Sequence, residues 1–228
     1  MEYGLQMYSV RDITQENLAD AVAKVAKIGY KLIEFAGFFG NSADAVNAML
    51  RENGVRVSGT HSSLNDLVND YEATLAFHKA IGNANYIIPG HDLSTREKLD
   101  AFIEQVNRLQ PMLEKEGIAL GYHNHDHEFK PNEDGLIAEE ELLQRTDILL
   151  EVDTYWVYAA GKDPVEFLKE HKDRIQVIHL KDGKGGHDCA SLGQGVAPVA
   201  QVRKAAIQLG LDMVVESEGL EPTGLEEV

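Results

Sequence analysis

Cysteine is almost absent from this sequence, because the 228 residues contain only Cys189. One cysteine cannot form an intrachain disulfide, and it provides neither a disulfide framework nor a thiolate zinc site. This scarcity is typical of a reducing compartment, so we expect a cytoplasmic protein. Long apolar runs are also missing, since no stretch approaches the roughly 20 apolar residues that span a bilayer. We therefore expect no membrane-spanning segment.

Positive charge is scarce as well. The sequence has 21 Lys and Arg residues against 38 Asp and Glu residues, which gives a formal net charge of −17. Such a charge repels phosphate backbones and anionic lipids, so we expect neither a nucleic-acid partner nor a membrane partner. The first residues contain no basic stretch followed by an apolar run, and we infer no export signal. A small neutral ligand, or one bound with the help of a cation, is the expected partner.

Short apolar runs alternate with longer segments of helical periodicity along the whole chain. This alternation is the signal of repeated βα units, and it occurs eight times. The 43% hydrophobic and 26% charged content is ordinary for a globular protein, and the length suits a single domain over residues 1–228. The expected strands cover residues 3–8, 31–36, 56–61, 86–90, 118–125, 148–153, 175–180 and 213–216.

This pattern predicts an α/β fold, specifically a (β/α)8 TIM barrel. Glycine ends several of the seven helical segments just before the next strand, where a left-handed cap favours it. An open doubly wound sheet is the alternative, but no glycine-rich fingerprint follows the first strand. Few residues follow the eighth strand, so the last helix should be short or missing. A second copy could cover the resulting apolar seam, which makes a homo-oligomer a candidate assembly.

Polar side chains interrupt the apolar strands near their C-terminal ends, where the reactive groups of a barrel gather. A barrel that had only to form a core would need none of them. We take them as candidates for substrate binding, metal binding or catalysis: Gln6, Glu34, His61, His91, His123, His125, Asp153, His179, Lys181 and Glu216.

Three of these residues predict a metal site. Glu216 directly follows two apolar residues, where an unpaired charge would be costly, and it therefore needs a cation. Asp153 shares a strand face with Glu151 but lies nearer the mouth of the barrel. His179 reaches the same height, and one histidine with two carboxylates suits Mn²⁺, Co²⁺, Zn²⁺ or Mg²⁺. Taken singly, a strand-end His can be a hydrogen-bonded rim residue, and a strand-end Asp can cap the next helix.

The segment after residue 122, His-Asn-His-Asp-His-Glu, is the densest polar cluster of the chain. An extended strand aims alternate residues to one side, so only one set can face the barrel interior. We interpret His123 as a fourth metal ligand, and His125 and Glu128 as substrate contacts. Asp126 and His127 are expected on a solvated loop.

Seven motifs along nearly the whole chain resemble the xylose-isomerase-like barrel superfamily of sugar phosphate isomerases and epimerases. They are Gly4-Leu5-Gln6-Met7-Tyr8-Ser9-Val10-Arg11, Ile33-Glu34-Phe35, Tyr122-His123-Asn124-His125-Asp126-His127-Glu128-Phe129, Val152-Asp153-Thr154-Tyr155-Trp156-Val157, His179-Leu180-Lys181-Asp182, Gly193-Gln194-Gly195-Val196 and Val215-Glu216.

The resemblance implies that Asp153, His179 and Glu216 hold one divalent metal ion. In relatives that epimerise ketoses, the fourth ligand is a Glu on the fifth strand, and two Glu side chains move protons. His123 stands at that position here, and Trp156 stands where those epimerases tend to have a histidine. Relatives with a histidine-rich fifth strand resemble inosose dehydratases and enzymes of keto-sugars, for which Trp156 would form a flat wall against a ring.

These observations lead to a hypothesis of proton abstraction next to the carbonyl of a sugar, keto-sugar or inosose. Glu216 or His123 would be the base, and Lys181 would offset the charge of an oxyanion. Epimerisation, isomerisation and dehydration all remain open outcomes. A sugar-binding barrel without catalytic activity is one rival, since the fifth-strand Glu is missing. An endonuclease IV-like enzyme is another, but the net charge of −17 argues against it.

Overall fold

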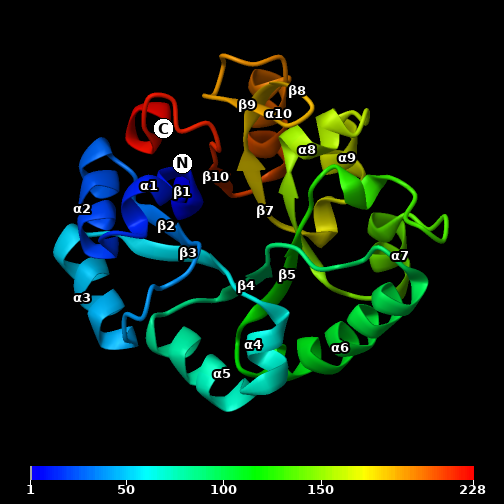
Figure 1. The fold of residues 1–228 in the computed structure, drawn as a ribbon, viewed down its shortest axis with the longest axis horizontal. Helices are drawn as coiled ribbons and strands as arrows, with labels where there is room; N and C mark the ends of the chain where they lie inside the picture. Colours follow the sequence, from blue (N-terminus) through cyan, green and yellow to red (C-terminus); the bar gives the residue numbers. More distant parts are fainter. Residues whose placement is uncertain (1) are drawn as a thin grey trace.

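Eight parallel strands close into a barrel in the computed structural model, which describes residues 2–228 (Figure 1). β10 pairs with both β1 and β7, and this pairing completes the ring. The (β/α)8 TIM barrel predicted from the sequence is therefore confirmed. The barrel strands are β1 (Gly4–Gln6), β2 (Leu32–Phe35), β3 (Arg56–His61), β4 (Asn85–Ile88), β5 (Ala119–His123), β6 (Leu149–Asp153), β7 (Ile175–Leu180) and β10 (Met213–Val215).

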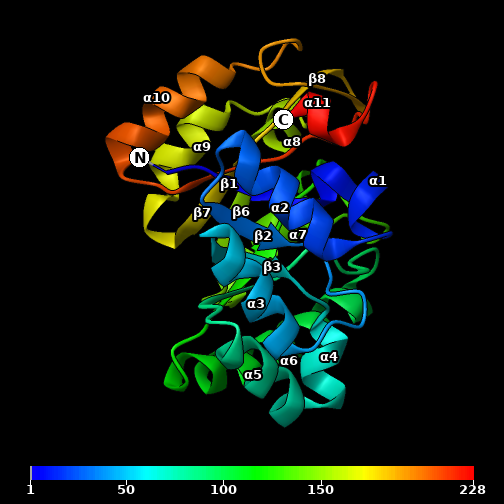
Figure 2. The same cartoon turned by 90° about the vertical axis from the view of Figure 1, so that its left-hand side faces the viewer.

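Helices surround the barrel, as Figures 1 and 2 show from two directions. Side chains of Asn17, Ser42 and Thr95 cap the N-termini of the helices that follow them, and Gly54 and Gly210 end helices in the left-handed conformation. No helix within residues 2–228 is long and apolar enough to cross a membrane. The helices are α1 (Arg11–Thr14), α2 (Leu18–Ile28), α3 (Ala43–Asn53), α4 (Leu64–Asn69), α5 (Tyr71–Ala80), α6 (Arg96–Lys115), α7 (Ala138–Arg145), α8 (Thr154–Ala159), α9 (Pro164–Glu170), α10 (Val199–Leu209) and α11 (Gly224–Glu227), with short 3₁₀ turns η1 (Met7–Val10), η2 (His127–Phe129) and η3 (Lys172–Arg174).

Several strands end earlier than expected. The first strand gives way to η1 at Met7, and the fifth ends at His123 instead of residue 125. The chain also contains a hairpin that the sequence analysis missed, formed by β8 (Asp182–Gly185) and β9 (Asp188–Ala190). Its glycine-rich sequence lacks the apolar alternation by which strands were recognised. The hairpin lies beside the barrel mouth, so it bears on the candidate site.

Inside the barrel, an apolar cluster lies beneath the ionisable side chains at the C-terminal ends of the strands. Ile87, Val177 and Val214 form a small buried cluster between facing strands. Gly59 makes room beside this cluster, since a Cβ atom there would lie 2.9 Å from Ile87 and 3.2 Å from Oε2 of Glu34. The close approach of these side chains therefore requires glycine at position 59. Charged groups above the cluster are shielded from water on their inner side.

The last helix is short, as predicted. α11 has four residues and packs against η1 and α1. The backbone N–H of Gly224 donates to Asp12 at 3.2 Å, while Leu225 and Val228 pack on the apolar cluster beneath α2 and α3. The C-terminal segment therefore covers part of the seam that a missing helix would expose.

Asp182 fixes the loop that follows the hairpin. Its buried carboxylate accepts backbone N–H hydrogen bonds from Gly183, Gly193, Gly195 and Ala197, at 2.9 to 3.0 Å. A Cβ atom on Gly195 would lie 2.2 Å from Oδ1 of Asp182, so the backbone can approach this closely only at glycine. The Gly-Gln-Gly-Val motif noted in the sequence is thus the binding partner of Asp182.

Replacing Asp182 with Ala should lower the free energy of unfolding by about 2–4 kcal/mol, because four backbone N–H groups, one buried and three part-buried, lose a charged acceptor. For a chain of this size we expect the Tm to fall by roughly 5–15 °C. Thermal unfolding followed by circular dichroism measures the change. Asp188→Ala, at an exposed position of the same hairpin, is the control. Equal melting temperatures for the two variants would contradict the role of Asp182.

Glu139 is a buried carboxylate in α7, away from the barrel mouth. It is 2% exposed, and neither side-chain oxygen has a hydrogen-bond partner within residues 2–228. Burial, followed by the nearby charge of Glu128, raises its pKa to about 8. The side chain therefore favours the neutral form over most of the physiological pH range.

The pKa of Glu139 gives the stability a definite pH dependence. Between its unfolded value of 4.5 and its folded value of about 8, the folded chain binds more protons than the unfolded chain. The contribution of Glu139 is fully present below pH 4.5 and is lost as the pH rises through about 8. Glu139→Gln should therefore raise the Tm by several degrees near pH 9 and change it little near pH 5. A larger gain at the lower pH would contradict this assignment.

Candidate active site

Ionisable side chains from five strands and the segment after β10 meet at the C-terminal end of the barrel. Register places His123 beside Glu151 and Asp153 beside His179, so the strand ends meet at one height. A cavity of about 330 Å³ opens above them. The residues beneath and around it include Glu34, His61, His123, Glu151, Asp153, His179, Lys181 and Glu216.

The two carboxylate oxygens of Asp153 have different surroundings. Oδ1 accepts hydrogen bonds from the backbone N–H groups of Tyr155 (2.9 Å) and Trp156 (3.1 Å), which caps α8. Oδ2 is buried and has no hydrogen-bond partner within the described chain, although Nζ of Lys181 lies 3.4 Å away. The helix-capping alternative is therefore correct, and one oxygen is still free to bind a cation.

His179 lies at the centre of the carboxylates. Its Nδ1 is 3.1 Å from Oε2 of Glu216, and its Nε2 is 2.7 Å from Oε1 of Glu34 and 3.2 Å from Oε1 of Glu151. Burial opposes a charge on this ring, but Glu151, Glu34 and Glu216 outweigh it and raise the pKa of His179 well above its usual value. The ring is thus a cation in the metal-free site.

His123 is a neutral ring. Burial, the largest influence, lowers its pKa to about 3 even though Nδ1 lies 3.1 Å from Oε2 of Glu151. The carboxylate can only accept, so Nδ1 carries the proton and Nε2 has a free lone pair. A neutral imidazole with a free nitrogen is the form that binds metal ions.

The carboxyl groups differ in charge because their surroundings differ. Burial, and then the charge of Glu151, raises the pKa of Glu34 to about 7, and burial likewise raises the pKa of Asp153 to about 7. Burial also raises the pKa values of Glu151 and Glu216, but nearby cations have the larger effect and hold both pKa values well below the usual range. These cations are His179 and His61 for Glu151, and Lys181 and His179 for Glu216. The site therefore contains both ionised and readily protonated carboxyl groups.

Lys181 is a fully buried cation that forms ion pairs with three carboxylates. Its Nζ lies 3.3 Å from Glu216 and 3.4 Å from Asp153, and it also hydrogen-bonds Glu218. Burial opposes its charge, but these carboxylates raise the pKa of Lys181 above its usual value. The same ammonium group lies 4.6 Å from the centre of the Trp156 ring. The ammonium group of Lys181 is therefore already engaged by side chains of the protein.

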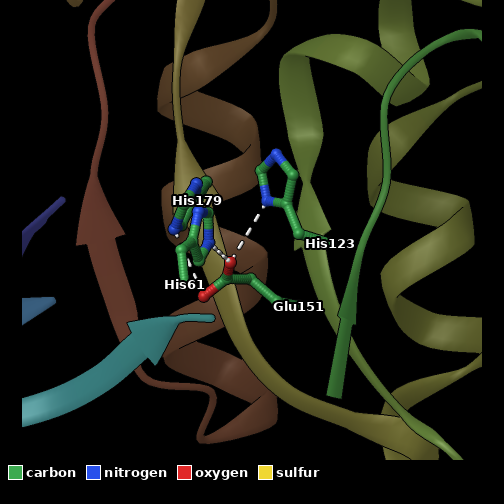
Figure 3. Close-up of side chains that lie close together, drawn as sticks. All are labelled: His61, His123, Glu151 and His179. Atoms are coloured by element: carbon green, nitrogen blue, oxygen red, sulfur yellow. Dashed lines mark hydrogen bonds and ion pairs between the residues drawn. The ribbon is translucent and has the colours of Figure 1, made fainter. Parts of the chain in front are cut away.

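Two sets of four residues bring possible ligand atoms within 4.8 Å of one another. One is His123, Asp153, His179 and Glu216, the set expected from the sequence. The other is His61, His123, Glu151 and His179, shown in Figure 3. The first set fits a divalent cation, because it combines the unpartnered Oδ2 of Asp153 with nitrogen and carboxylate donors.

The remaining candidates occupy different positions around the mouth. His61 and His125 line the cavity, and the buried ring of Trp156 lies 5.9 Å from the ring of His125. Gln6 does not line the cavity; its Nε2 donates to Oε1 of Glu34 at 2.6 Å, and its Oε1 accepts from the backbone N–H of Tyr8.

Glu128 and His91 are two further expected substrate contacts that do not line the cavity. Glu128 is fully buried and accepts hydrogen bonds from the hydroxyl group of Tyr122 and the backbone N–H of His125, both at 2.8 Å. His91 packs against the ring of Phe102 in α6. Their positions favour structural roles in the loops that shape the mouth.

The loop after β5 also differs from expectation at Asp126. This residue is 6% exposed and paired with Lys130, while His127 is solvated as expected. Three further residues were missed as candidates: Glu151, Glu218 and Asp182. Glu151 had a signal in the sequence, since it shares its strand face with Asp153.

Lys181→Met should lower the free energy of unfolding of the metal-free protein by about 3–5 kcal/mol, because it leaves buried carboxylates without their cation. Divalent metal should restore part of the loss by neutralising the same groups. Thermal unfolding with and without Mn²⁺ measures both effects. Lys162→Met, at an exposed position, provides the control. If Lys181→Met melts like wild type, the described ion pairs contribute no net stability.

Comparison with known proteins gives consistent matches. A 1.70 Å structure of a sugar phosphate isomerase/epimerase from Parabacteroides distasonis superposes with a TM-score of 0.84 and 25% identity, covering 99% of this chain and 94% of that one. An inosose dehydratase from Geobacillus thermodenitrificans is 32% identical over 94 residues, which are 39% of this chain and 30% of the relative. Another inosose dehydratase, from Geobacillus kaustophilus, is 23% identical over 204 residues, covering 75% of this chain and 63% of the relative.

The chain thus covers less than two thirds of the length of these dehydratases. A match to a protein family extends over residues 22–227. The chain belongs to the xylose isomerase-like TIM barrel family.

Proposed function

We propose that this protein is a divalent-metal-dependent enzyme that removes a proton next to the carbonyl of an unphosphorylated keto-sugar or inosose, acting as an isomerase, epimerase or dehydratase. The observation that carries the proposal is the buried set His123, Asp153, His179 and Glu216, in which Oδ2 of Asp153 has no hydrogen-bond partner within residues 2–228. The dehydratase and isomerase/epimerase relatives support this reaction class.

A divalent ion held by these four residues would act as a Lewis acid toward a carbonyl oxygen of the substrate. The ligand atoms follow from the contacts of each side chain: Nε2 of His123, Oδ2 of Asp153, Nδ1 of His179 and a carboxylate oxygen of Glu216. Each of the first three has its other polar atom engaged by the protein. These contacts with the protein therefore fix the orientation of each of the three ligand side chains.

Glu216 is the base in this proposal. It is ionised, because Lys181 and His179 hold its pKa low, and it lines the cavity. An ionised carboxylate at the cavity wall can accept a proton from a carbon held above it. The contacts of Lys181 with three carboxylates favour a role in keeping them ionised, and we assign it this role in place of direct contact with an oxyanion.

His61 and His125 line the same cavity and are the candidates to return a proton to the substrate. Burial opposes charge on both rings; the pKa of His61 is nevertheless raised by Glu151 and Glu34, whereas that of His125 is lowered. His61 is therefore the better proton donor near neutral pH. Return of the proton to another face gives epimerisation, and loss of a β-hydroxyl group gives dehydration.

The charges at the mouth favour a substrate without phosphate. Glu216 and Glu218 line the cavity, and the buried cation Lys181 is already paired with both. A phosphate dianion would meet like charges there. The volume of about 330 Å³ lies within the range of small-molecule pockets. A larger cavity of about 840 Å³ lies on the flank between α8, α9 and α10, away from these ionisable groups.

The purified protein should contain about one divalent ion per chain, and Asp153→Ala should lose it. In D₂O, the metal-loaded wild type should exchange the hydrogen next to the carbonyl of an inosose or keto-sugar. Glu216→Gln should slow this exchange by at least about 100-fold, since it removes the base and a carboxylate oxygen of the proposed ligand set. Metal analysis and proton NMR provide the two readouts, with the exposed Glu170→Gln as the control.

Phosphorylated counterparts should react at least about tenfold more slowly, because of the acidic mouth. A faster reaction of the phosphates would contradict the substrate class. Metal binding without exchange on any keto-sugar or inosose would instead favour a sugar-binding barrel that lacks catalytic activity.

A further inference from the structure

One buried carboxylate contacts three imidazole rings from three different strands. Oε2 of Glu151 lies 2.5 Å from Nε2 of His61 and 3.1 Å from Nδ1 of His123, while Oε1 lies 3.2 Å from Nε2 of His179. Figure 3 shows the three rings gathered around this side chain. Glu151 itself is 0% exposed. No other carboxylate in the described chain contacts as many histidines.

These contacts determine which ring nitrogens remain for other partners. Because a carboxylate only accepts, Nδ1 of His123 carries a proton toward Glu151, which leaves Nε2 as the nitrogen that can bind a metal ion. In His179, Nε2 faces Glu151 and donates to Glu34, so Nδ1 is left to face Glu216. Glu151 thus leaves Nε2 of His123 available, and together with Glu34 it leaves Nδ1 of His179 on the side of Glu216.

Glu151 also belongs to the second set of possible metal ligands, but its oxygens are less available to an ion than Oδ2 of Asp153. Its Oε2 is already occupied by two ring nitrogens, and an ion there would have to displace His61 from a 2.5 Å contact. Its Oε1 has no hydrogen-bond donor but lies in an ion pair with His179. Oδ2 of Asp153 also has no hydrogen-bond donor, and its ion-pair partner is Nζ of Lys181 at 3.4 Å, not a histidine.

We propose that Glu151 is a positioning residue that fixes the ring orientation and tautomer of His123 and, together with Glu34, holds the ring of His179 in place, and that it does not bind the metal ion itself. This inference rests on the proposed function. Glu151 would act on the metal site through two of its ligands. Carboxylates that hydrogen-bond the second ring nitrogen of metal-bound histidines have this effect in other proteins. His61 is the third ring held by the same carboxylate, and this contact couples the cavity wall to the metal ligands.

The test compares Glu151→Gln with wild type, since the amide keeps the shape of the side chain but loses its charge and one acceptor. Co²⁺ affinity is measured by competition with a chelator, and the visible Co²⁺ spectrum reports the ligand set. Nitrogen-15 NMR of the histidine rings in the metal-free protein reports the tautomer of His123. Asp153→Ala tests the ligand set, and Glu139→Gln, at a buried carboxylate outside the site, is the matched control.

We expect Glu151→Gln to weaken Co²⁺ binding by roughly 10–100-fold with the spectrum of the bound ion retained. The His123 ring should change from one tautomer to a mixture. Asp153→Ala should abolish binding, and Glu139→Gln should bind like wild type.

Two results would overturn the inference. Wild-type affinity and an unchanged His123 tautomer in Glu151→Gln would show that Glu151 positions neither ring. Loss of the ion in Glu151→Gln together with its retention in Asp153→Ala would make Glu151 a ligand. A wild-type protein that binds no Co²⁺ would refute the proposed function, while the His123 tautomer in the metal-free protein would still decide the role of Glu151.

Discussion

The balance of buried charge at the barrel mouth is the constraint on which the rest of the site depends. Glu34, Glu151, Asp153 and Glu216 are each at most 3% exposed, and Lys181 is fully buried among them. Isolated charges in such a place would be strongly unfavourable. The fold accommodates them because every ionised carboxylate lies against His61, His179 or Lys181, and because Glu34 and Asp153 can take up a proton near neutral pH. The proposed divalent ion would fit this arrangement, since a cation can replace the protons.

The fold and the strand-end residues were accessible from the sequence because period-two alternation and glycine caps are local signals. Asp153, His179 and Glu216 each stand where an apolar strand meets a polar residue, so their convergence follows once a parallel barrel is assumed. Lys181 could be recognised by the same reasoning, although its pairing with three carboxylates depends on side-chain directions that a sequence does not contain.

Other features required the three-dimensional arrangement. Glu151 lies one pleat below the mouth, where the sequence offers no sign that three rings from distant strands surround it. Glu128 was expected to contact the substrate as part of the dense polar cluster that follows Tyr122 and was taken to extend the fifth strand past His123. The chain turns there instead, and Tyr122 and His125 enclose the carboxylate. The β8–β9 hairpin escaped notice because glycine, rather than apolar residues, dominates its first strand.

The anchoring of the β8–β9 hairpin separates two kinds of sequence change. Asp182 holds the base of the hairpin and the loop behind it through four backbone hydrogen bonds, whereas residues 184–188 at the tip are exposed. His187 of the tip lies 5.0 Å from the ring of Trp156, at the edge of the mouth. Substitutions or insertions at the tip therefore alter what the mouth presents to an incoming molecule without disturbing the carboxylates below. In evolutionary terms, and under the proposed function, the hairpin is a region in which substrate preference would diversify while the reaction chemistry is inherited unchanged.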